Sequence, residues 1–252
     1  MHMFEKNNPV LISMPRTGST VTGKMLYNIA HHRYGSKNYL NQLTTVVPQY
    51  HAEFERRDGV IQQVTYRREK NGFVKEFENR AAIIQGRMAL LAGDTQYTMK
   101  LIADDYTPRV LDFLREHYDF ILLERRDTLS QVLSYSTMMV TNRHEYRKDD
   151  PFAHSYFDLK HCLMFLDYMI QYKRVKQQVP DAKVIYYEDL MKLGGNTAAL
   201  QQLLGLPVEV VPAALAIDTV PTPYTADLED LLINRAEWLE HKPTILRLLA
   251  AI

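Results

Sequence analysis

The chain has 252 residues with 30 Lys plus Arg and 30 Asp plus Glu, so its formal net charge at pH 7 is zero. A balanced charge excludes a general affinity for polyanions, and any basic site must be local. The length predicts a single domain with insertions, and the one cysteine, Cys162, excludes an internal disulfide and suits a reducing compartment.

The N-terminal segment, residues 1–9, reads MHMFEKNNP and is too polar for a signal peptide. No apolar run in the sequence approaches the about 20 residues that a membrane-spanning helix needs. We therefore expect a cytoplasmic protein without a membrane span. The sequence carries no internal repeat and no nucleic-acid-binding motif, and it gives no indication of the oligomeric state.

Residues 10–24, VLISMPRTGSTVTGK, form the most informative stretch. Apolar residues 10–12 predict a short strand buried on both faces, and Pro15 ends it because proline lacks the N–H that a sheet ladder needs. Apolar residues at helical spacing then predict a helix beginning near Ser19. Such a loop aims backbone N–H groups and a helix dipole at an anion, and Arg16 adds a positive charge. Similar glycine turns occur in α/β proteins that bind no anion, so the loop alone leaves both interpretations open.

Two overlapping patterns compete within this stretch. Residues 18–25, GSTVTGKM, match the nucleoside-triphosphate pattern GxxxxGK[ST] except at the last position. The last hydroxyl of that pattern binds Mg²⁺, and the thioether of Met25 is a poor ligand for so hard an ion. The predicted helix start also places Gly23 and Lys24 inside the helix, too far along to wrap a phosphate. The shorter stretch 15–20, PRTGST, is therefore the better candidate.

Weaker signals run from residue 27 to residue 118. His31 and His32 are adjacent, and neighbouring helical residues do not share a face, so we expect a solvated helix end there instead of a metal site. The expected elements that follow are a loop or short helices over 38–55, a β segment over 60–68, a helical hairpin over 73–93, a strand over 99–103 and a helix over 107–118. This predicts a largely helical insertion over about residues 36–95.

A second informative segment, residues 119–135, reads DFILLERRDTLSQVLSY. Residues 120–123 predict another buried strand, and Asp127 is a candidate N-cap for the helix that follows. Arg126 leaves the strand end, and Ser134 lies on the helix two turns later. A guanidinium and a hydroxyl so placed can bind one phosphate from two directions.

The last part of the chain begins with the clearest amphipathic helix, predicted over 158–179, which carries Cys162 on its apolar face. A strand over 182–187 follows, and then YEDL at 187–190. The acidic pair of that stretch is more simply explained as capping a turn than as catalytic. A Pro-rich crossing segment over 207–223 and helices over 227–241 and 244–252 form a helical C-terminal part.

Together these segments resemble the sulfotransferases that use 3′-phosphoadenosine 5′-phosphosulfate (PAPS). PRTGST resembles their 5′-phosphosulfate loop, commonly PKSGTT or PRSGST, and Arg126, Asp127, Gln131 and Ser134 resemble their 3′-phosphate motif RRDxxxQxxS. YEDL followed by a helix ending in LGL resembles a third family stretch. The closest similarity is to the bacterial and phage branch, which includes trehalose-sulfotransferase-like proteins.

The resemblance implies a P-loop-type three-layer α/β fold, with a central parallel sheet of about 4–5 strands flanked by helices. It implies in-line, metal-independent transfer of a sulfuryl group from PAPS to a hydroxyl or amine of a carbohydrate or other small acceptor. Arg16 would stabilise charge on the leaving group, because a guanidinium is a poor proton donor. The implied 5′-phosphosulfate contacts are Arg16, Thr17, Gly18, Ser19 and Thr20, and the implied 3′-phosphate contacts are Arg126 and Ser134.

The general base is less clear from the sequence. In the trehalose-type branch a glutamate follows the first helix, but the nearest match by position here is Gln42, which cannot act as a base. Glu53, in HAEF, is the first candidate, and His51 and Asp104 are the others. The family's C-terminal RKGxxG segment is absent, so adenine contacts are not assigned.

Three functions remain open from the sequence. The first is the PAPS-dependent sulfotransferase, and the second is a P-loop kinase of nucleosides or small molecules, against which Met25 counts. The third is a non-catalytic sulfotransferase-like binding protein, which the Gln42 departure keeps open. The identity of the acceptor is not encoded in any recognisable motif.

Overall fold

The computed structural model describes residues 8–36, 38–41, 52–57, 60–65, 67–69, 72–74, 97–102, 108–141, 155–214 and 228–252. Its centre is a five-stranded sheet in the order β2-β7-β1-β8-β9, and every neighbouring pair is parallel. The strands are β1 (Pro9–Ser13), β2 (Asn38–Asn41), β7 (Tyr97–Ile102), β8 (Asp119–Glu124) and β9 (Lys183–Tyr186). The predicted sheet of about 4–5 parallel strands is therefore confirmed.

The central strand β1 is buried along its whole length, as its apolar run predicts. Because side chains alternate across a strand, Val10 and Ile12 join one core cluster, whereas Leu11 joins the other. In the next strand, β8, Leu122 belongs to the first cluster and Ile121 to the second. The sheet thus has an apolar core on both faces.

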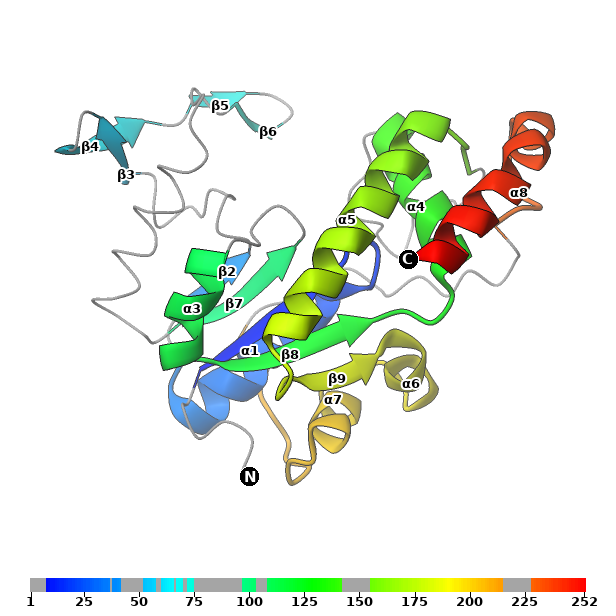
Figure 1. Cartoon of the computed structure of the whole chain (residues 1–252). Helices are drawn as coiled ribbons and strands as arrows, with labels where there is room; N and C mark the ends of the chain where they lie inside the picture. Colours follow the sequence, from blue (N-terminus) through cyan, green and yellow to red (C-terminus); the bar gives the residue numbers. More distant parts are fainter. Residues whose placement is uncertain are drawn as a thin grey trace.

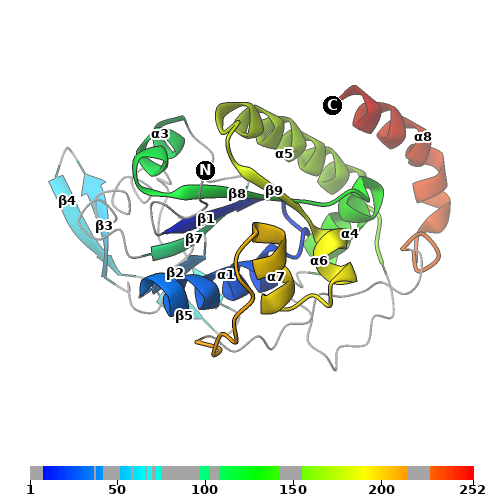
Figure 2. The same cartoon turned by 90° about the horizontal axis from the view of Figure 1, so that it is seen from below.

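Helices cover both faces of the sheet and make the fold three-layered. Figure 2 shows α3 and α5 on one side of the sheet and α1 and α7 on the other, with α8 outside α5. The helices are α1 (Ser19–Tyr34), α3 (Pro108–His117), α4 (Thr128–Thr141), α5 (Leu159–Gln178), α6 (Tyr187–Lys192), α7 (Thr197–Leu204) and α8 (Arg235–Ala251) (Figure 1). Along the described residues, no helix is long and apolar enough to cross a membrane.

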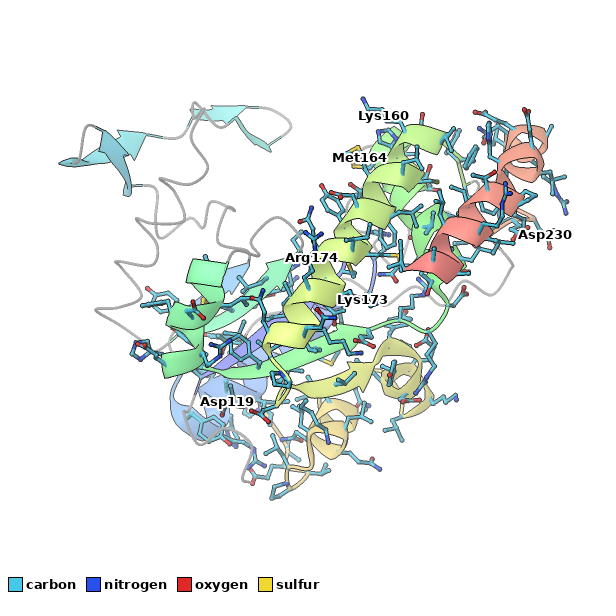
Figure 3. The ribbon with its side chains drawn as sticks, viewed as in Figure 1. Asp119, Lys160, Met164, Lys173, Arg174 and Asp230 are labelled. Carbon is cyan, nitrogen blue, oxygen red and sulfur yellow. The ribbon has the colours of Figure 1, made fainter. Side chains whose placement is uncertain are left out.

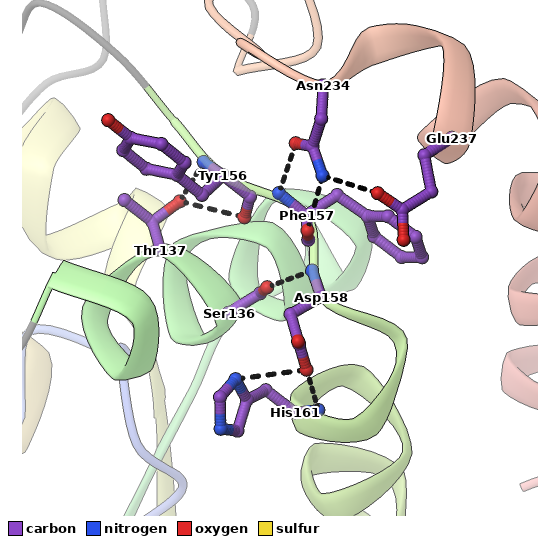
Figure 4. A network of polar contacts seen from close by, with 8 residues as sticks. All are labelled: Ser136, Thr137, Tyr156, Phe157, Asp158, His161, Asn234 and Glu237. Atoms are coloured by element: carbon purple, nitrogen blue, oxygen red, sulfur yellow. Dashed lines mark hydrogen bonds and ion pairs between the residues drawn. The ribbon is translucent and has the colours of Figure 1, made fainter.

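A polar network ties the C-terminal helix to the rest of the fold (Figure 4). The Asn234 side chain accepts a hydrogen bond from Phe157 N (2.9 Å) and donates one to Phe157 O (2.7 Å). From α4, Ser136 accepts from the N–H of Asp158 at 2.7 Å, and Asp158 in turn caps α5 by accepting from His161 N at 2.9 Å. The segment before α5 is therefore held from α4 on one side and from the start of α8 on the other.

The predicted insertion over 36–95 contains strands in its described parts. These are β2, which joins the main sheet, and the hairpins β3–β4 (Ala52–Arg57, Val60–Thr65) and β5–β6 (Arg67–Glu69, Gly72–Val74). The β segment expected over 60–68 is therefore confirmed, whereas the loop or short helices expected over 38–55 and the start of the helical hairpin expected over 73–93 are wrong. β2 is a strand because its backbone pairs with β7, a long-range contact that outweighs its weak local pattern. Residues 75–96, most of the predicted helical hairpin, lie outside the described residues.

The C-terminal helices also differ from the prediction. A single helix, α8, runs from Arg235 to Ala251 and includes Pro243, where the sequence predicted a break. Its start lies later than predicted, because the preceding residues 228–234 form turns that pair with the segment before α5.

Candidate active site

The loop between β1 and α1 has the backbone of an anion-binding turn. Arg16 has a φ of 63° and Gly18 a φ of 75°, so the chain passes through the left-handed region twice before α1 begins at Ser19. Gly18 is the N-cap of α1, and no side chain caps it by a hydrogen bond. Since the first turn of any helix lacks intrahelical partners for its N–H groups, this N-terminus can receive an anion.

Two side chains, one from the loop and one from α4, maintain the shape of the loop. Thr17 is buried and donates its hydroxyl proton to Met14 O at 2.9 Å, and Gln131 of α4 donates to Pro15 O at 2.7 Å. Both bonds satisfy carbonyl groups of the sharp turn. The Thr17 hydroxyl is therefore occupied with the loop itself, and what it offers a ligand is its backbone N–H.

Arg16 and Ser134 meet at this loop although they are 118 positions apart. Arg16 Nε donates to Ser134 Oγ at 3.0 Å, and Ser134 is buried at 2% exposure. The structure thus brings together one residue from each of the two predicted phosphate-binding motifs.

Arg126 has a different environment from that of Ser134. Its Nη1 and Nη2 each lie 2.7 Å from an oxygen of Asp189, and its guanidinium stacks 4.0 Å above the ring of Tyr186. The guanidinium lowers the pKa of the Asp189 carboxyl. Glu188 accepts from the backbone N–H groups of Arg126 (3.0 Å) and Asp127 (3.2 Å). The acidic pair of YEDL therefore holds the β8–α4 connection, in line with the capping interpretation.

Three residues that the sequence did not assign to the site lie against the loop. Lys100 is 4% exposed, and its Nζ donates to Thr20 Oγ1 at 3.2 Å. The Tyr187 ring covers Gly18 so closely that a Cβ there would lie 2.7 Å from it. Arg125 Nη1 lies 3.5 Å from Arg16 O, and its guanidinium is 5.6 Å from the Tyr187 ring centroid. For Lys100 the available sequence signal was a lysine inside the apolar run of residues 99–103, MKLIA, because lysine is rarely buried without a role.

Gly23 and Lys24 lie inside α1, as predicted from the helix start. A Cβ on Gly23 would lie 2.3 Å from the hydroxyl of Tyr39 on β2, so the absence of a side chain there makes room for helix–sheet packing. The glycine of the apparent GxxxxGK pattern thus has a packing explanation.

The predicted general bases are less completely described. Glu53 lies on β3, opposite Val64 of β4. Gln42, His51 and Asp104 lie outside the described residues.

Comparison with known protein families and with curated proteins finds no family and no relative that matches this chain.

Proposed function

We propose that this chain is a PAPS-dependent sulfotransferase that moves a sulfuryl group to the hydroxyl or amine of a small acceptor, with a carbohydrate as the first class to test. The observation that carries the proposal is the Arg16–Ser134 hydrogen bond at the uncapped start of α1. It joins, at one point in space, the two motifs on which the resemblance depends.

The positive charges around the loop favour the phosphosulfate anhydride of PAPS. Arg16 and the buried Lys100 contribute positive charge beside an N-terminus that has no acidic residue in its first turn. Preorganised cations and N–H donors stabilise the negative charge that grows on the leaving phosphate oxygen as the S–O bond breaks. In the overall reaction the acceptor loses a proton and gains the sulfuryl group, and 3′-phosphoadenosine 5′-phosphate (PAP) leaves.

One of the proposed 3′-phosphate contacts, Arg126, has guanidinium donors beyond those that it uses on Asp189. Arg126 uses two of the donors of its guanidinium on Asp189, and a guanidinium has five. Ser134 accepts a hydrogen bond from Arg16, which holds its hydroxyl beside the 15–20 loop. Asp189 would orient Arg126 for this contact.

A kinase is the alternative that the same loop allows. Its pattern requires Lys24 to reach the phosphates, whereas Lys24 lies within α1, beyond the first turn.

The free and buried Cys162 is compatible with a reducing, cytoplasmic location, which we keep as part of the proposal.

Calorimetry with PAP, 5′-AMP and ATP, each with and without Mg²⁺, tests the proposal. PAP and AMP differ in the 3′-phosphate, so their affinity ratio isolates that contact. We expect PAP to bind without metal, and Ser134→Ala and Arg126→Ala to weaken PAP by about tenfold or more while AMP changes little. Ser130→Ala, on the same helix, and the exposed Arg174→Gln are matched controls that should bind as wild type.

The competing functions predict other results. Mg²⁺-dependent ATP binding that is indifferent to Arg126 would refute the sulfotransferase and support the kinase. PAP binding without transfer to any acceptor in a panel of carbohydrates and phenols would support the non-catalytic binding protein. If a transfer is found, Glu53→Gln tests the first candidate base through loss of turnover with PAP binding retained.

A further inference from the structure

A cavity of about 520 Å³ lies beside the 15–20 loop, on the side of α5. It is bounded by Thr17 of the loop, by Arg125 and Gln131 from the end of β8 and from α4, and by Met169, Tyr172 and Lys173 of α5. Its volume is in the range of small-molecule sites, and its lining combines apolar side chains with a few convergent polar groups, as such sites do.

Most charged groups of this cavity already have partners. Glu124 Oε1 accepts from Lys176 Nζ at 2.7 Å and from the Tyr172 hydroxyl at 3.4 Å. Lys173 donates to the backbone oxygen of Ile252. Burial raises the pKa of Tyr172, so its hydroxyl stays protonated and adds no negative charge.

Arg125 is the exception. Its Nε is buried without a hydrogen-bond partner, its Nη1 makes one long contact to Arg16 O at 3.5 Å, and no carboxylate pairs with it within the described part of the chain. A buried donor of a charged group is unfavourable unless an acceptor satisfies it, and a guanidinium is best satisfied by an oxyanion. The cavity therefore contains a cation that needs an anion.

The rest of the lining combines uncharged polar side chains with apolar ones. Met14 and Tyr172 are buried, and Met169 packs against the same core cluster. Methionine adapts its shape and contacts aromatic rings favourably, so these side chains suit a flat apolar body.

We propose that this cavity binds a small organic anion, with its acidic group on Arg125 and an apolar ring against Met169 and Tyr172. In the proposed function this ligand would be the acceptor of the sulfuryl group, and that role rests on the proposed function. The binding of the anion itself does not depend on sulfuryl transfer. Arg125 would then select acidic acceptors over neutral ones of the same shape.

The test compares acids with their neutral counterparts. The probes are 4-hydroxybenzoate and 4-hydroxyphenylacetate, each paired with the corresponding alcohol, and binding is measured by calorimetry in a low-salt amine buffer. The variants are Arg125→Gln, which removes the charge, Arg125→Lys, which keeps it, and Met169→Trp, which fills the cavity. Arg174→Gln is the control, because Arg174 is exposed and lies on a different side of α5 from Lys173 (Figure 3).

We expect the acids to bind the wild type at least about tenfold more tightly than the alcohols. Arg125→Gln should remove that difference, Arg125→Lys should keep part of it, Met169→Trp should weaken both kinds of probe, and Arg174→Gln should change nothing. The wild-type comparison decides the charge preference even if Arg125→Gln does not fold.

Equal binding of acids and alcohols, no binding of any probe, or an Arg125→Gln variant that binds acids like the wild type would overturn the proposal. PAP binding, measured on the same samples, keeps the two proposals apart. Acid binding without PAP binding would support the anion site in the cavity and refute the sulfotransferase. PAP binding without acid binding would support the PAPS site and refute the anion site.

Discussion

Replacing Gly18 by alanine should be much more damaging than the same change at Gly35. Both glycines have a left-handed backbone, with φ of 75° and 69°. For an alanine that conformation costs about 1 kcal/mol at either position. At Gly18 the new Cβ would also lie 2.7 and 2.8 Å from two ring carbons of Tyr187, whereas at Gly35 nothing lies within 4 Å.

The clash adds the strain of overpacking, about 1–3 kcal/mol. We therefore expect Gly18→Ala to lower the free energy of unfolding by about 2–4 kcal/mol and Gly35→Ala by about 1 kcal/mol. Urea denaturation followed by tryptophan fluorescence measures both, because Trp238 is the single tryptophan and is fully buried.

A double-mutant cycle with Tyr187→Leu isolates the contact. If the ring causes the extra loss, Gly18→Ala should become as mild as Gly35→Ala in the Tyr187→Leu background. Equal losses for the two glycines in the wild-type background would refute the packing of Tyr187 on the loop.

Three further predictions follow from other parts of the fold. Asn234→Ala should lower the free energy of unfolding by about 2 kcal/mol in urea denaturation, because it leaves the buried N–H and C=O of Phe157 without their side-chain partner, and Asn234→Asp should recover part of it. Cys162 is fully buried and its pKa is raised to about 12 by desolvation, so Ellman's reagent at pH 8 should react with it only as fast as the native protein opens, and a burst of labelling would contradict that. Arg126 lowers the pKa of Asp189, so their pairing stabilises the fold above the ordinary aspartate pKa, and this stabilisation is lost as the pH falls below that value. The difference in the free energy of unfolding between wild type and Asp189→Asn should therefore shrink on acidification from pH 6 to pH 2.5. A constant difference would show that the pairing contributes nothing.

Local signals in the sequence were sufficient for the main elements of the sheet and for the position of the loop. The apolar run at 10–12, Pro15 after it and the helical spacing from residue 21 each act over a few residues, so they are readable without the fold. The N-cap Asp127 was readable for the same reason, since a cap bonds to backbone only a few positions ahead.

Elements with weak local patterns were predicted wrongly. Asn38–Asn41 has no alternation that identifies a strand, and it becomes one because β7 supplies its hydrogen-bond partners. Two helices were expected, over 227–241 and 244–252, with Pro243 between them. Trp238 and Ile245, on either side of Pro243, are both fully buried, and this packing supports one continuous α8.

The sequence by itself determined which residues are candidates for binding an anion, because Arg16, Arg126 and Ser134 stand in recognisable spacings. Only the tertiary structure decided how those residues are paired. Arg126 pairs with Asp189, and Arg16 donates a hydrogen bond to Ser134. Arg125, which precedes Arg126 in the sequence, lines a cavity. The physical reason is that a charged side chain is oriented by its nearest opposite charge or acceptor, and those partners come from strands and helices that only folding brings together.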